Sequence, residues 1–203
     1  KLFASIRLDL WQPGKPEGCS EDKYQKAIPT SLCNMTGFVS MAFGSKINSD
    51  LVARLAFSHF FVPNGLPKLI IIDDGSEFKG VLTQMCETLG IQYYVAAPEE
   101  HNAILSERFH RYLNKVERLG VVDQQSYEKW KMNAIFASYA WNASPIDGTD
   151  VIRSFAAKAR TFRFPLDIQG THEEARIPQE GEQALQHLET MFPLWFQQKE
   201  LLR

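Results

Sequence analysis

The segment Leu69–Phe78, with the sequence LIIIDDGSEF, constrains the fold more than any other part of the chain. Its first four residues are apolar without a break, which is the pattern of a strand buried on both faces, and such strands lie in sheets that helices cover on both sides. The apolar run ends in two carboxylates, and Gly75 is expected to let the chain turn sharply away from them. The segment therefore predicts an α/β protein that presents acidic side chains at the end of a buried strand.

The rest of the chain fits an alternation of strands and helices. A strand pattern covers Phe3–Trp11, and two β-like runs, Ile28–Met35 and Phe38–Phe43, are separated at Thr36-Gly37 as in a hairpin. The later expected elements are a helix capped by Ser49 and ended by Pro63, an amphipathic helix over Val81–Leu89 closed by Gly90, a strand over Ile91–Ala97, and helices over Ala103–Leu119 and Tyr127–Trp141. Early antiparallel strands followed by β-α alternation predict a mixed sheet with helices on its faces.

Composition and charge narrow the class of protein. The 203 residues are 44% hydrophobic and 23% charged, which favours a globular domain with a real core over a disordered chain. A formal net charge of -2 weighs weakly against a nucleic-acid partner, although a local basic stripe is compatible with it. Three cysteines without Cys-x-x-Cys spacing argue against a disulfide framework and a structural zinc site. No apolar run approaches the ~20 residues that span a bilayer.

The two ends of the chain carry a separate expectation. The first residues lack an initiator methionine and a signal-peptide pattern, so the chain reads as a fragment of a longer polypeptide that is not secreted. From Thr171 the composition turns polar, and a segment of helical pattern follows. We therefore expect a core domain over residues 1–170, followed by a polar linker and C-terminal helical extension over residues 171–203.

Three acids are candidate metal ligands: Asp9 on the first strand, Asp73 after the buried strand, and Glu107 near the start of a helix. Mg²⁺ prefers oxygen ligands and binds through a few carboxylates, water and substrate phosphates. Phosphoryl transfer on DNA uses one cation at the attacking oxygen and another at the leaving oxygen. The chain holds 24 acids, however, and acids at strand ends are common, so composition alone does not single out these three.

The motifs around these acids together resemble the catalytic core of retroviral and LTR-retrotransposon integrases. In that family a strand ends in Asp-Asn-Gly-x-x-Phe, a helix and a Gly-Ile strand follow, and a Pro-containing loop leads to a helix with Glu before Arg. The stretch from IIIDDGSEFKG to AILSERFHRYLN follows this order. LDLWQP is similar to the first Asp motif, and YAWNASPIDGTDVIRSF and FRFPLDI are similar to the downstream Tyr-Asn-x-Ser-Pro region and its retrotransposon continuation, so the resemblance spans about residues 3–168.

The resemblance implies an RNase H-like fold, a five-stranded mixed sheet flanked by helices. It implies a catalytic and metal-binding triad of Asp9, Asp73 and Glu107 that holds Mg²⁺ or Mn²⁺, with two ions when DNA is bound. In the implied reaction, water trims the 3′ end of the element DNA, and the freed 3′-hydroxyl then attacks a phosphodiester of target DNA. The implied partners are element ends, target DNA and further copies of the chain, as a homodimer or higher homo-oligomer, with no membrane. The implied location is the nucleus or a cytoplasmic retrotransposon particle.

Six residues are the expected DNA contacts. Four lie on or near the exposed face of the helix that carries Glu107, and two lie in the loop before it; they are Arg108, Arg111, Lys115, Arg118, His101 and Asn102. Asn114 is assigned to the same exposed face. A solvated helix face that includes a favourable Glu107–Arg111 pair is the alternative interpretation of this pattern.

Two departures from the family pattern bear on function. Asp74 replaces the usual Asn, and Ala103 stands where a Gly is usual; Asp73 is preferred over Asp74 as the ligand because Gly75 then keeps the family register. Two other functions stay open: an RNase H-type nuclease that only hydrolyses, and a domesticated non-catalytic domain that serves as a scaffold or DNA-binding module. Strand joining separates the first from an integrase, and the second predicts no change of activity when the acids are removed.

Overall fold

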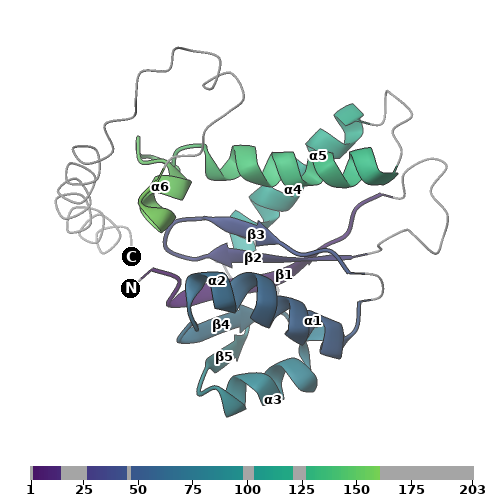
Figure 1. Ribbon diagram of the computed structural model, residues 1–203, viewed down its shortest axis with the longest axis vertical. Helices are drawn as coiled ribbons and strands as arrows, with labels where there is room; N and C mark the ends of the chain where they lie inside the picture. Colours follow the sequence, from purple (N-terminus) through teal and green to yellow (C-terminus); the bar gives the residue numbers. More distant parts are fainter. Residues whose placement is uncertain (1, 15–26, 45–46, 98–102, 121–126, 161–203) are drawn as a thin grey trace.

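Five strands form one mixed sheet in the computed structural model, which describes residues 2–14, 27–44, 47–97, 103–120 and 127–160. The strands are β1 (Ser5–Trp11), β2 (Ile28–Cys33), β3 (Val39–Met41), β4 (Leu69–Ile72) and β5 (Gln92–Val95), in the order β3-β2-β1-β4-β5. β2 pairs antiparallel with β1 and β3, whereas β4 runs parallel to β1 and β5 (Figure 1). The expected five-stranded mixed sheet is confirmed. The extension over residues 171–203 lies outside the described residues, so its boundary stays a prediction.

Helices cover both faces of this sheet (Figure 1). The helical elements in chain order are α1 (Ser49–Leu55), the π-helix η1 (Ala56–Phe61), α2 (Val62–Asn64), the 3₁₀-helix η2 (Ser76–Phe78), α3 (Val81–Thr88), α4 (Ala103–Gly120), α5 (Tyr127–Asn142) and α6 (Arg153–Lys158). α1, η1 and α3 pack on one face, and α4 and α5 pack on the other. None of the helices in the described part is long and apolar enough to cross a membrane.

An apolar cluster lies on each side of the sheet. The larger one joins the even-numbered residues of β1 and β4 to α1, η1 and α3, and it includes Ile6, Leu8, Ile70, Ile72, Val52, Phe60 and Leu82. The smaller one joins the sheet to α4 and α5, and it includes Trp11, Leu32, Val39, Phe109, Leu113, Ala134 and Ala137. Because side chains alternate between faces along a strand, the odd-numbered residues of β1 face α4. This alternation sends Arg7 and Asp9 to the α4 side.

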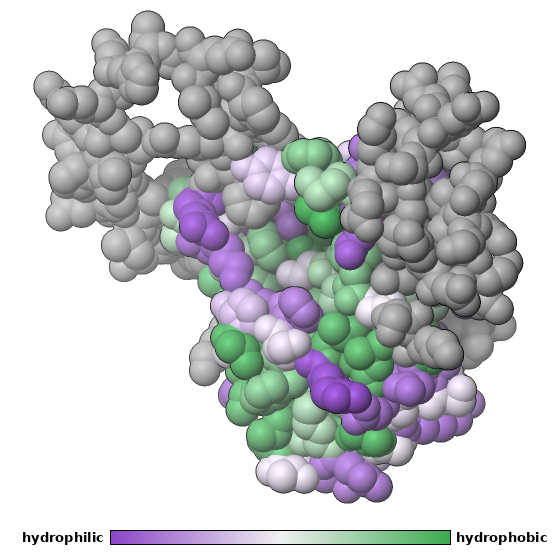
Figure 2. Space-filling model, turned by 45° about the vertical axis from the view of Figure 1, so that its right-hand side comes forward, coloured by the Kyte–Doolittle hydropathy of each residue, from purple (hydrophilic) through white to green (hydrophobic). Residues whose placement is uncertain are grey.

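Some large apolar side chains remain on the surface. Figure 2 shows hydrophobic residues gathered across the middle of one face, with hydrophilic residues beside them. The exposed side chains occur on η1, β5 and α5, among other places, and include Phe57, Tyr93, Tyr94, Val95, Met132, Ile135 and Phe136. Contiguous apolar surface on a folded domain commonly marks a site of interaction.

The start of the first helical segment differs from the expectation. Asn48, not Ser49, caps α1: its backbone is extended, and its side-chain oxygen accepts a hydrogen bond from the Leu51 N–H at 2.8 Å. The Ser49 hydroxyl instead donates to the Lys79 carbonyl and accepts from the Val81 N–H, which ties α1 to the start of α3. Asn and Ser are about equally good caps, so neighbouring candidates are separated only by tertiary contacts.

The end of this segment also differs, because Pro63 lies inside it. η1 has the wider turn of a π-helix, in which the Val62 N–H reaches the Phe57 carbonyl, and α2 continues through Pro63 to Asn64. In a regular α-helix the proline ring would clash with the carbonyl four residues earlier. The wider turn avoids this clash, and the helix ends instead at Gly65, whose φ of 81° favours glycine.

Candidate functional site

Asp9 and Asp73 come from neighbouring parallel strands and lie in the same row across the sheet. β1 and β4 pair in the register Ser5–Leu69, Ile6–Ile70 and Arg7–Ile71, and each aspartate follows two residues after the last pair. Both side chains therefore leave the sheet on the α4 side. Their proximity shows in the pKa of Asp73, which partial burial raises above its usual value and which the charge on Asp9 raises further.

Backbone N–H groups orient both carboxylates. Asp9 Oδ1 accepts a hydrogen bond from the Leu10 N–H at 2.8 Å, and Asp73 Oδ1 accepts one from the Gly75 N–H at 2.9 Å. The bond from Gly75 opposes the rise in the pKa of Asp73 because it stabilises the charged form. Each aspartate thus has one oxygen fixed by its own strand end.

Gly75 serves a different purpose from the one expected. Its φ of -61° is open to most residues, so the turn itself does not require glycine. A Cβ at this position would instead lie 2.8 Å from Glu77 Oε1 and 2.9 Å from Asp73 Oδ1. The missing side chain therefore leaves room for two carboxylates to approach the backbone.

Asp74 points to a different partner. Its carboxylate forms an ion pair with Lys79 Nζ at 2.8 Å, and its side chain is 79% exposed. Alternation along the chain already separates Asp74 from the row that holds Asp9 and Asp73. This arrangement supports the preference for Asp73 as the ligand.

His110 on α4 lies over Asp9, a contact that the sequence reasoning missed. His110 Nδ1 is 4.0 Å from Asp9 Oδ2, and His110 Nε2 is 3.0 Å from the Thr30 hydroxyl, which donates to the Asp9 carbonyl at 3.2 Å. Because the Thr30 proton is used in this way, Nε2 is the histidine atom that donates to Thr30. Burial lowers the pKa of His110, and the charge on Asp9 offsets this only in part. The sequence contains a signal for the side on which His110 lies, because His110 follows Glu107 by three residues and residues at this spacing share one side of a helix.

A second contact fixes the register between α4 and β1. The Trp11 indole N–H donates to Asn114 Oδ1 at 2.7 Å, so Asn114 faces the sheet and its assignment to the exposed face was wrong. Asn114 follows His110 by four residues on the helix, and Trp11 follows Asp9 by two on the strand. These steps are both ~6–7 Å, at 1.5 Å per helical and 3.3 Å per strand residue. The match explains why α4 contacts Trp11 and Asp9 in succession.

Glu107 lies on α4 one turn from His110, but its carboxylate is directed elsewhere. Glu107 Oε1 accepts from Arg111 Nη2 at 2.6 Å and from Nε at 3.2 Å, and both side chains are exposed. In the described part of the chain, no three His, Cys, Asp or Glu side chains come together as a ready-made metal cluster. The structure therefore brings Asp9 and Asp73 together and leaves Glu107 apart, paired as the alternative interpretation expected.

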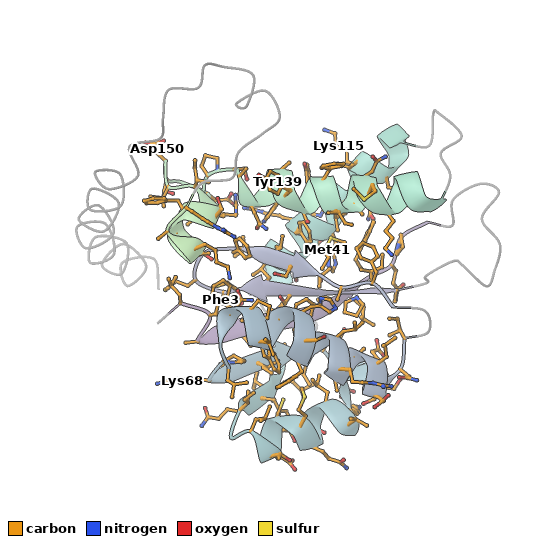
Figure 3. The ribbon with its side chains drawn as sticks, in the orientation of Figure 1. Phe3, Met41, Lys68, Lys115, Tyr139 and Asp150 are labelled. Atoms are coloured by element: carbon orange, nitrogen blue, oxygen red, sulfur yellow. The ribbon has the colours of Figure 1, made fainter. Side chains whose placement is uncertain are left out.

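The predicted DNA contacts have mixed surroundings. Arg108 forms an ion pair with Asp147, and Arg111 pairs with Glu107. Lys115 is exposed and points away from the sheet (Figure 3). His101, Asn102 and the side chain of Arg118 lie outside the described residues, so all six assignments stay predictions.

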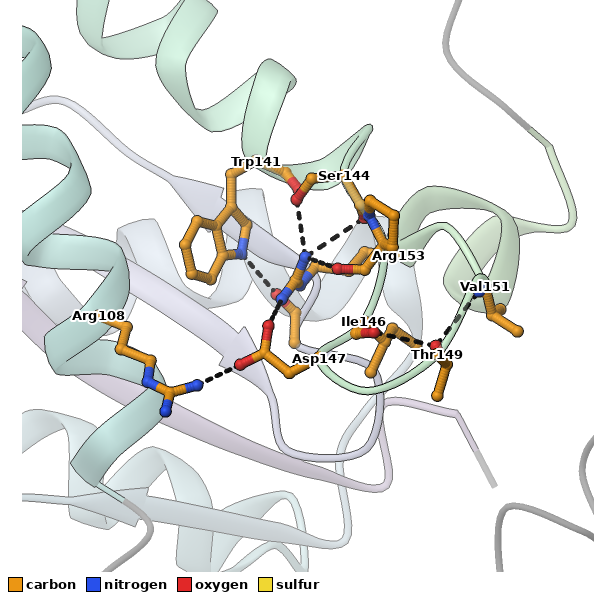
Figure 4. Close-up of polar contacts among 10 residues, drawn as sticks. Arg108, Trp141, Ser144, Ile146, Asp147, Thr149, Val151 and Arg153 are labelled. Atoms are coloured by element: carbon orange, nitrogen blue, oxygen red, sulfur yellow. Dashed lines mark hydrogen bonds and ion pairs between the residues drawn. The ribbon is translucent and has the colours of Figure 1, made fainter.

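The Asp147 carboxylate joins α4 to α6 through a second arginine (Figure 4). Arg153 is 2% exposed, its Nη2 donates to Asp147 Oδ1 at 3.1 Å, and its Nη1 donates to the Ser144 hydroxyl at 2.7 Å and to the Pro145 carbonyl. The guanidinium also lies over the Trp141 ring, 4.5 Å from its centroid. This network holds the NASPIDGT turn against the helix that carries Glu107.

No protein-family model and no curated relative matches the chain. Among solved structures, the integrase catalytic core domain of HTLV-2 in complex with magnesium is similar in its dimeric form, with a TM-score of 0.58 at 15% identity over 75% of this chain and 94% of that one. Its trimeric form gives a TM-score of 0.55 at 15% identity, covering 74% and 93%.

The catalytic core domain of BIV integrase is similar to the same degree, with a TM-score of 0.57 at 14% identity over 76% of this chain and 93% of that one. Identity at this level speaks for architecture rather than for chemistry. The chain therefore has the RNase H-like fold of retroviral integrase catalytic cores.

Proposed function

We propose that this chain is the catalytic core of an LTR-retrotransposon integrase, which trims the 3′ ends of element DNA and joins them to target DNA. The observation that carries the proposal is the pairing of Asp9 and Asp73, from neighbouring parallel strands, beneath the helix that bears Glu107. Two like charges held next to each other are costly unless a cation joins them, and the raised pKa of Asp73, caused by burial and then by the charge on Asp9, reflects this cost. The fold similarity to integrase cores supports the same conclusion.

The donor set fits a hard divalent cation. Asp9, Asp73 and Glu107 offer only oxygen ligands, which suit Mg²⁺ or Mn²⁺. When bound, such ions supply Lewis acidity to the attacking and leaving oxygens of the phosphodiester. The HTLV-2 core domains were solved in complex with magnesium, which supports this choice of ion.

The chain's own residues would prepare this site in three ways. The Leu10 and Gly75 N–H groups hold one oxygen of each aspartate, so the second oxygen is left for a ligand. His110, neutral because of its burial, lies over Asp9 without adding a positive charge to the site. Glu107 must leave Arg111 before it can join the aspartates, and the exposed pair is weak enough for a ligand to displace.

The proposed partners follow from this activity. Element ends and target DNA are the substrates, and the six residues named above are the proposed DNA contacts. The HTLV-2 core is known in dimeric and trimeric forms, which supports a homo-oligomer here. The nucleus or a cytoplasmic retrotransposon particle is the proposed location.

A calorimetric titration of Mn²⁺ into the metal-free protein tests the site directly. Asp73→Asn and Asp74→Asn are a matched pair, since each removes one negative charge from adjacent positions. We expect Asp74→Asn to keep the affinity of the parent and Asp73→Asn to lose it by at least about tenfold, because Asp74 is turned toward Lys79. Equal affinities in the two variants would show that the metal site is misassigned.

A strand-transfer assay with the same variants separates the possible functions. Joining of a labelled 3′ end to a second duplex, lost in Asp73→Asn, is the result expected of an integrase. Cleavage without joining would identify a nuclease that only hydrolyses. DNA binding without Mn²⁺ binding or activity would identify a non-catalytic module.

A further inference from the structure

Arg7 is a buried arginine next to the paired aspartates, and its guanidinium has no hydrogen-bond or ion-pair partner in the described part of the chain. It lies on β1 two residues before Asp9, on the same face, and is 7% exposed. Its strand neighbours are Leu32 of β2 and Ile71 of β4, neither of which offers a polar side chain. The described residues form no hydrogen bond or ion pair with its side chain, and its Nε and Nη2 atoms are buried without a partner among them.

The second buried arginine has a different environment, although its Nε is also without a partner among the described residues. Arg153 is buried to a similar degree, but it pairs with Asp147, donates to the Ser144 hydroxyl and lies over the Trp141 ring. A buried guanidinium without such partners is costly, because its hydration is lost and nothing replaces it. Nothing among the described residues offsets this cost at Arg7, whereas an acceptor on a bound ligand would.

The charge of Arg7 reaches the row of carboxylates. It lowers the pKa of Asp73 against the larger effect of burial, so the guanidinium lies close enough to act on that group. Rows on one face of a strand are ~6.6 Å apart, which an extended arginine side chain spans. The aspartates already accept backbone N–H groups, and neither forms an ion pair with Arg7.

Tyr94 continues the row of Arg7 toward the edge of the sheet. Arg7 pairs with Ile71 across β1 and β4, and Ile71 pairs with Tyr94 across β4 and β5, so all three side chains share the α4 face. Tyr94 is 47% exposed, so about half of its surface is open to solvent. Two strand spacings of ~4.8 Å separate the backbones of Arg7 and Tyr94.

We propose that Arg7 and Tyr94 form a nucleotide subsite beside the paired aspartates, in which the guanidinium binds a phosphate oxygen of the DNA strand and the tyrosine ring stacks on a base. A guanidinium offers a planar fork of N–H donors that matches phosphate, and aromatic rings bind bases of any sequence. The inference rests on the proposed function, because it takes the strand that reacts at Asp9 and Asp73 as its ligand. The subsite orders the nucleotide next to the reacting phosphate.

Charge-matched variants test the role of Arg7. Arg7→Met removes the charge but keeps an unbranched apolar stem, and Arg7→Lys keeps the charge but loses the fork. Arg54→Met is the matched control, because Arg54 is exposed on α1 on the opposite side of the sheet. The probe is a short fluorescein-labelled duplex with a single-stranded 3′ overhang, and its affinity is read by fluorescence anisotropy at several salt concentrations.

Two readouts should move in opposite directions in Arg7→Met. DNA binding should weaken by about tenfold, which corresponds to ~1.4 kcal/mol, and its logarithmic salt slope should fall by about one. Mn²⁺ binding without DNA, measured by calorimetry, should tighten, because a positive charge beside the aspartates is gone. If Arg7 had only a structural role, its replacement would weaken both DNA binding and Mn²⁺ binding. Arg7→Lys should keep most of the salt slope while losing affinity, and Arg54→Met should match the parent.

The Tyr94 variants give an independent reading that does not depend on the folding of Arg7→Met. Tyr94→Ala should weaken DNA binding by several-fold, and Tyr94→Phe, which keeps the ring, should match the parent. Unchanged DNA affinity in Arg7→Lys and Tyr94→Ala, with parent-like melting curves, would overturn the subsite. Absence of an Asp73-dependent Mn²⁺ site in the parent would instead overturn the proposed function, and the anisotropy data would still show whether Arg7 and Tyr94 contact DNA.

Discussion

The charge of Asp73 opposes folding in the metal-free protein. Its pKa is raised from 3.8, chiefly by burial and then by Asp9, so the folded protein holds the proton more tightly than the unfolded chain does. The cost is therefore present at neutral pH and disappears as the pH falls through the raised pKa and below 3.8. Asp73→Asn should melt at or above the parent at pH 7 without metal, and the difference should vanish in acid.

Thermal melts in the presence of a chelator measure this difference, with Asp74→Asn as the control. Asp74 is exposed and paired with Lys79, so its removal should not raise the melting temperature. A clear loss of stability in Asp73→Asn at pH 7 would contradict the picture of two aspartates in one row.

His110 should give the protein a separate dependence on pH. Burial lowers its pKa below 6.5, so the unfolded chain takes up a proton before the folded protein does. Stability is then fully present above about pH 6.5 and falls as the pH drops toward the lowered value. His110→Gln, which can still donate to Thr30, should lose less stability between about pH 6.5 and 5 than the parent.

Urea unfolding across this pH range checks the prediction. His59→Gln is a suitable control, because His59 is exposed on η1, a helix that packs on the opposite side of the sheet from His110. Parallel slopes for the parent and His110→Gln would show that the imidazole is not held neutral.

The network that joins α4 to α6 contains one buried and one exposed ion pair on the same carboxylate. Arg153 Nη2 and Arg108 Nη1 bind different oxygens of Asp147, but the Arg153 side chain is 3% exposed and that of Arg108 is 52% exposed. Arg153→Met should cost about 2–4 kcal/mol of unfolding free energy, because the Ser144 and Pro145 groups lose their donor. Arg108→Met should cost about 0–1 kcal/mol.

Each of the two variants removes one positive charge, so chemical denaturation of both compares the buried and the exposed ion pair at an equal change of net charge. Comparable losses in both would mean that the exposed pair fixes α4 as firmly as the buried one. The same data bear on DNA binding. If Arg108→Met costs little unfolding free energy, Arg108 is free to leave Asp147 and bind a phosphate.

The elements that the sequence predicts well are those whose signal is local and periodic. The strand Leu69–Ile72 has the bounds expected from its apolar run, and the helices Ala103–Gly120 and Tyr127–Asn142 differ from expectation by one residue at their ends. Helix periodicity also predicts the buried positions Phe109 and Leu113. The shared row of Asp9 and Asp73 can be predicted from the sequence, because side chains alternate between the two faces of a strand and the two strands run parallel.

The features that escaped prediction depend on contacts between distant residues. His110 contacts Thr30 across 80 positions, and Trp11 contacts Asn114 across 103. The spacing from Glu107 indicates the side of α4 on which His110 lies, but no local pattern identifies the partner in either pair. The π-helix before Pro63 escaped because a proline is ordinarily the sign of a helix end. The direction of the Glu107 carboxylate is a rotamer choice between Arg111 and the sheet, which sequence spacing does not decide.

The described part of the molecule is a sheet between two helical layers, and one of those layers has exposed apolar side chains. α5 buries Ala134 and Ala137 against the sheet side, yet Met132, Ile135 and Phe136 are 46%, 38% and 60% exposed. A helix that is apolar on both sides is expected to be covered on both sides. A second copy of the chain is the cover that the proposed homo-oligomer supplies.

Phe136→Glu should therefore shift the protein toward the monomer. Placing a charge at the centre of an apolar contact leaves that charge without water or a partner. The association free energy should therefore weaken by about 2 kcal/mol or more, which raises the dissociation constant at least about thirtyfold. Sedimentation velocity over a range of protein concentrations measures the shift. Phe57→Glu is the matched control, because Phe57 is 42% exposed on η1, across the sheet from α5. If Phe57→Glu dissociates the oligomer and Phe136→Glu does not, the copies meet through the α1–η1 side, and the exposed side of α5 must serve another contact.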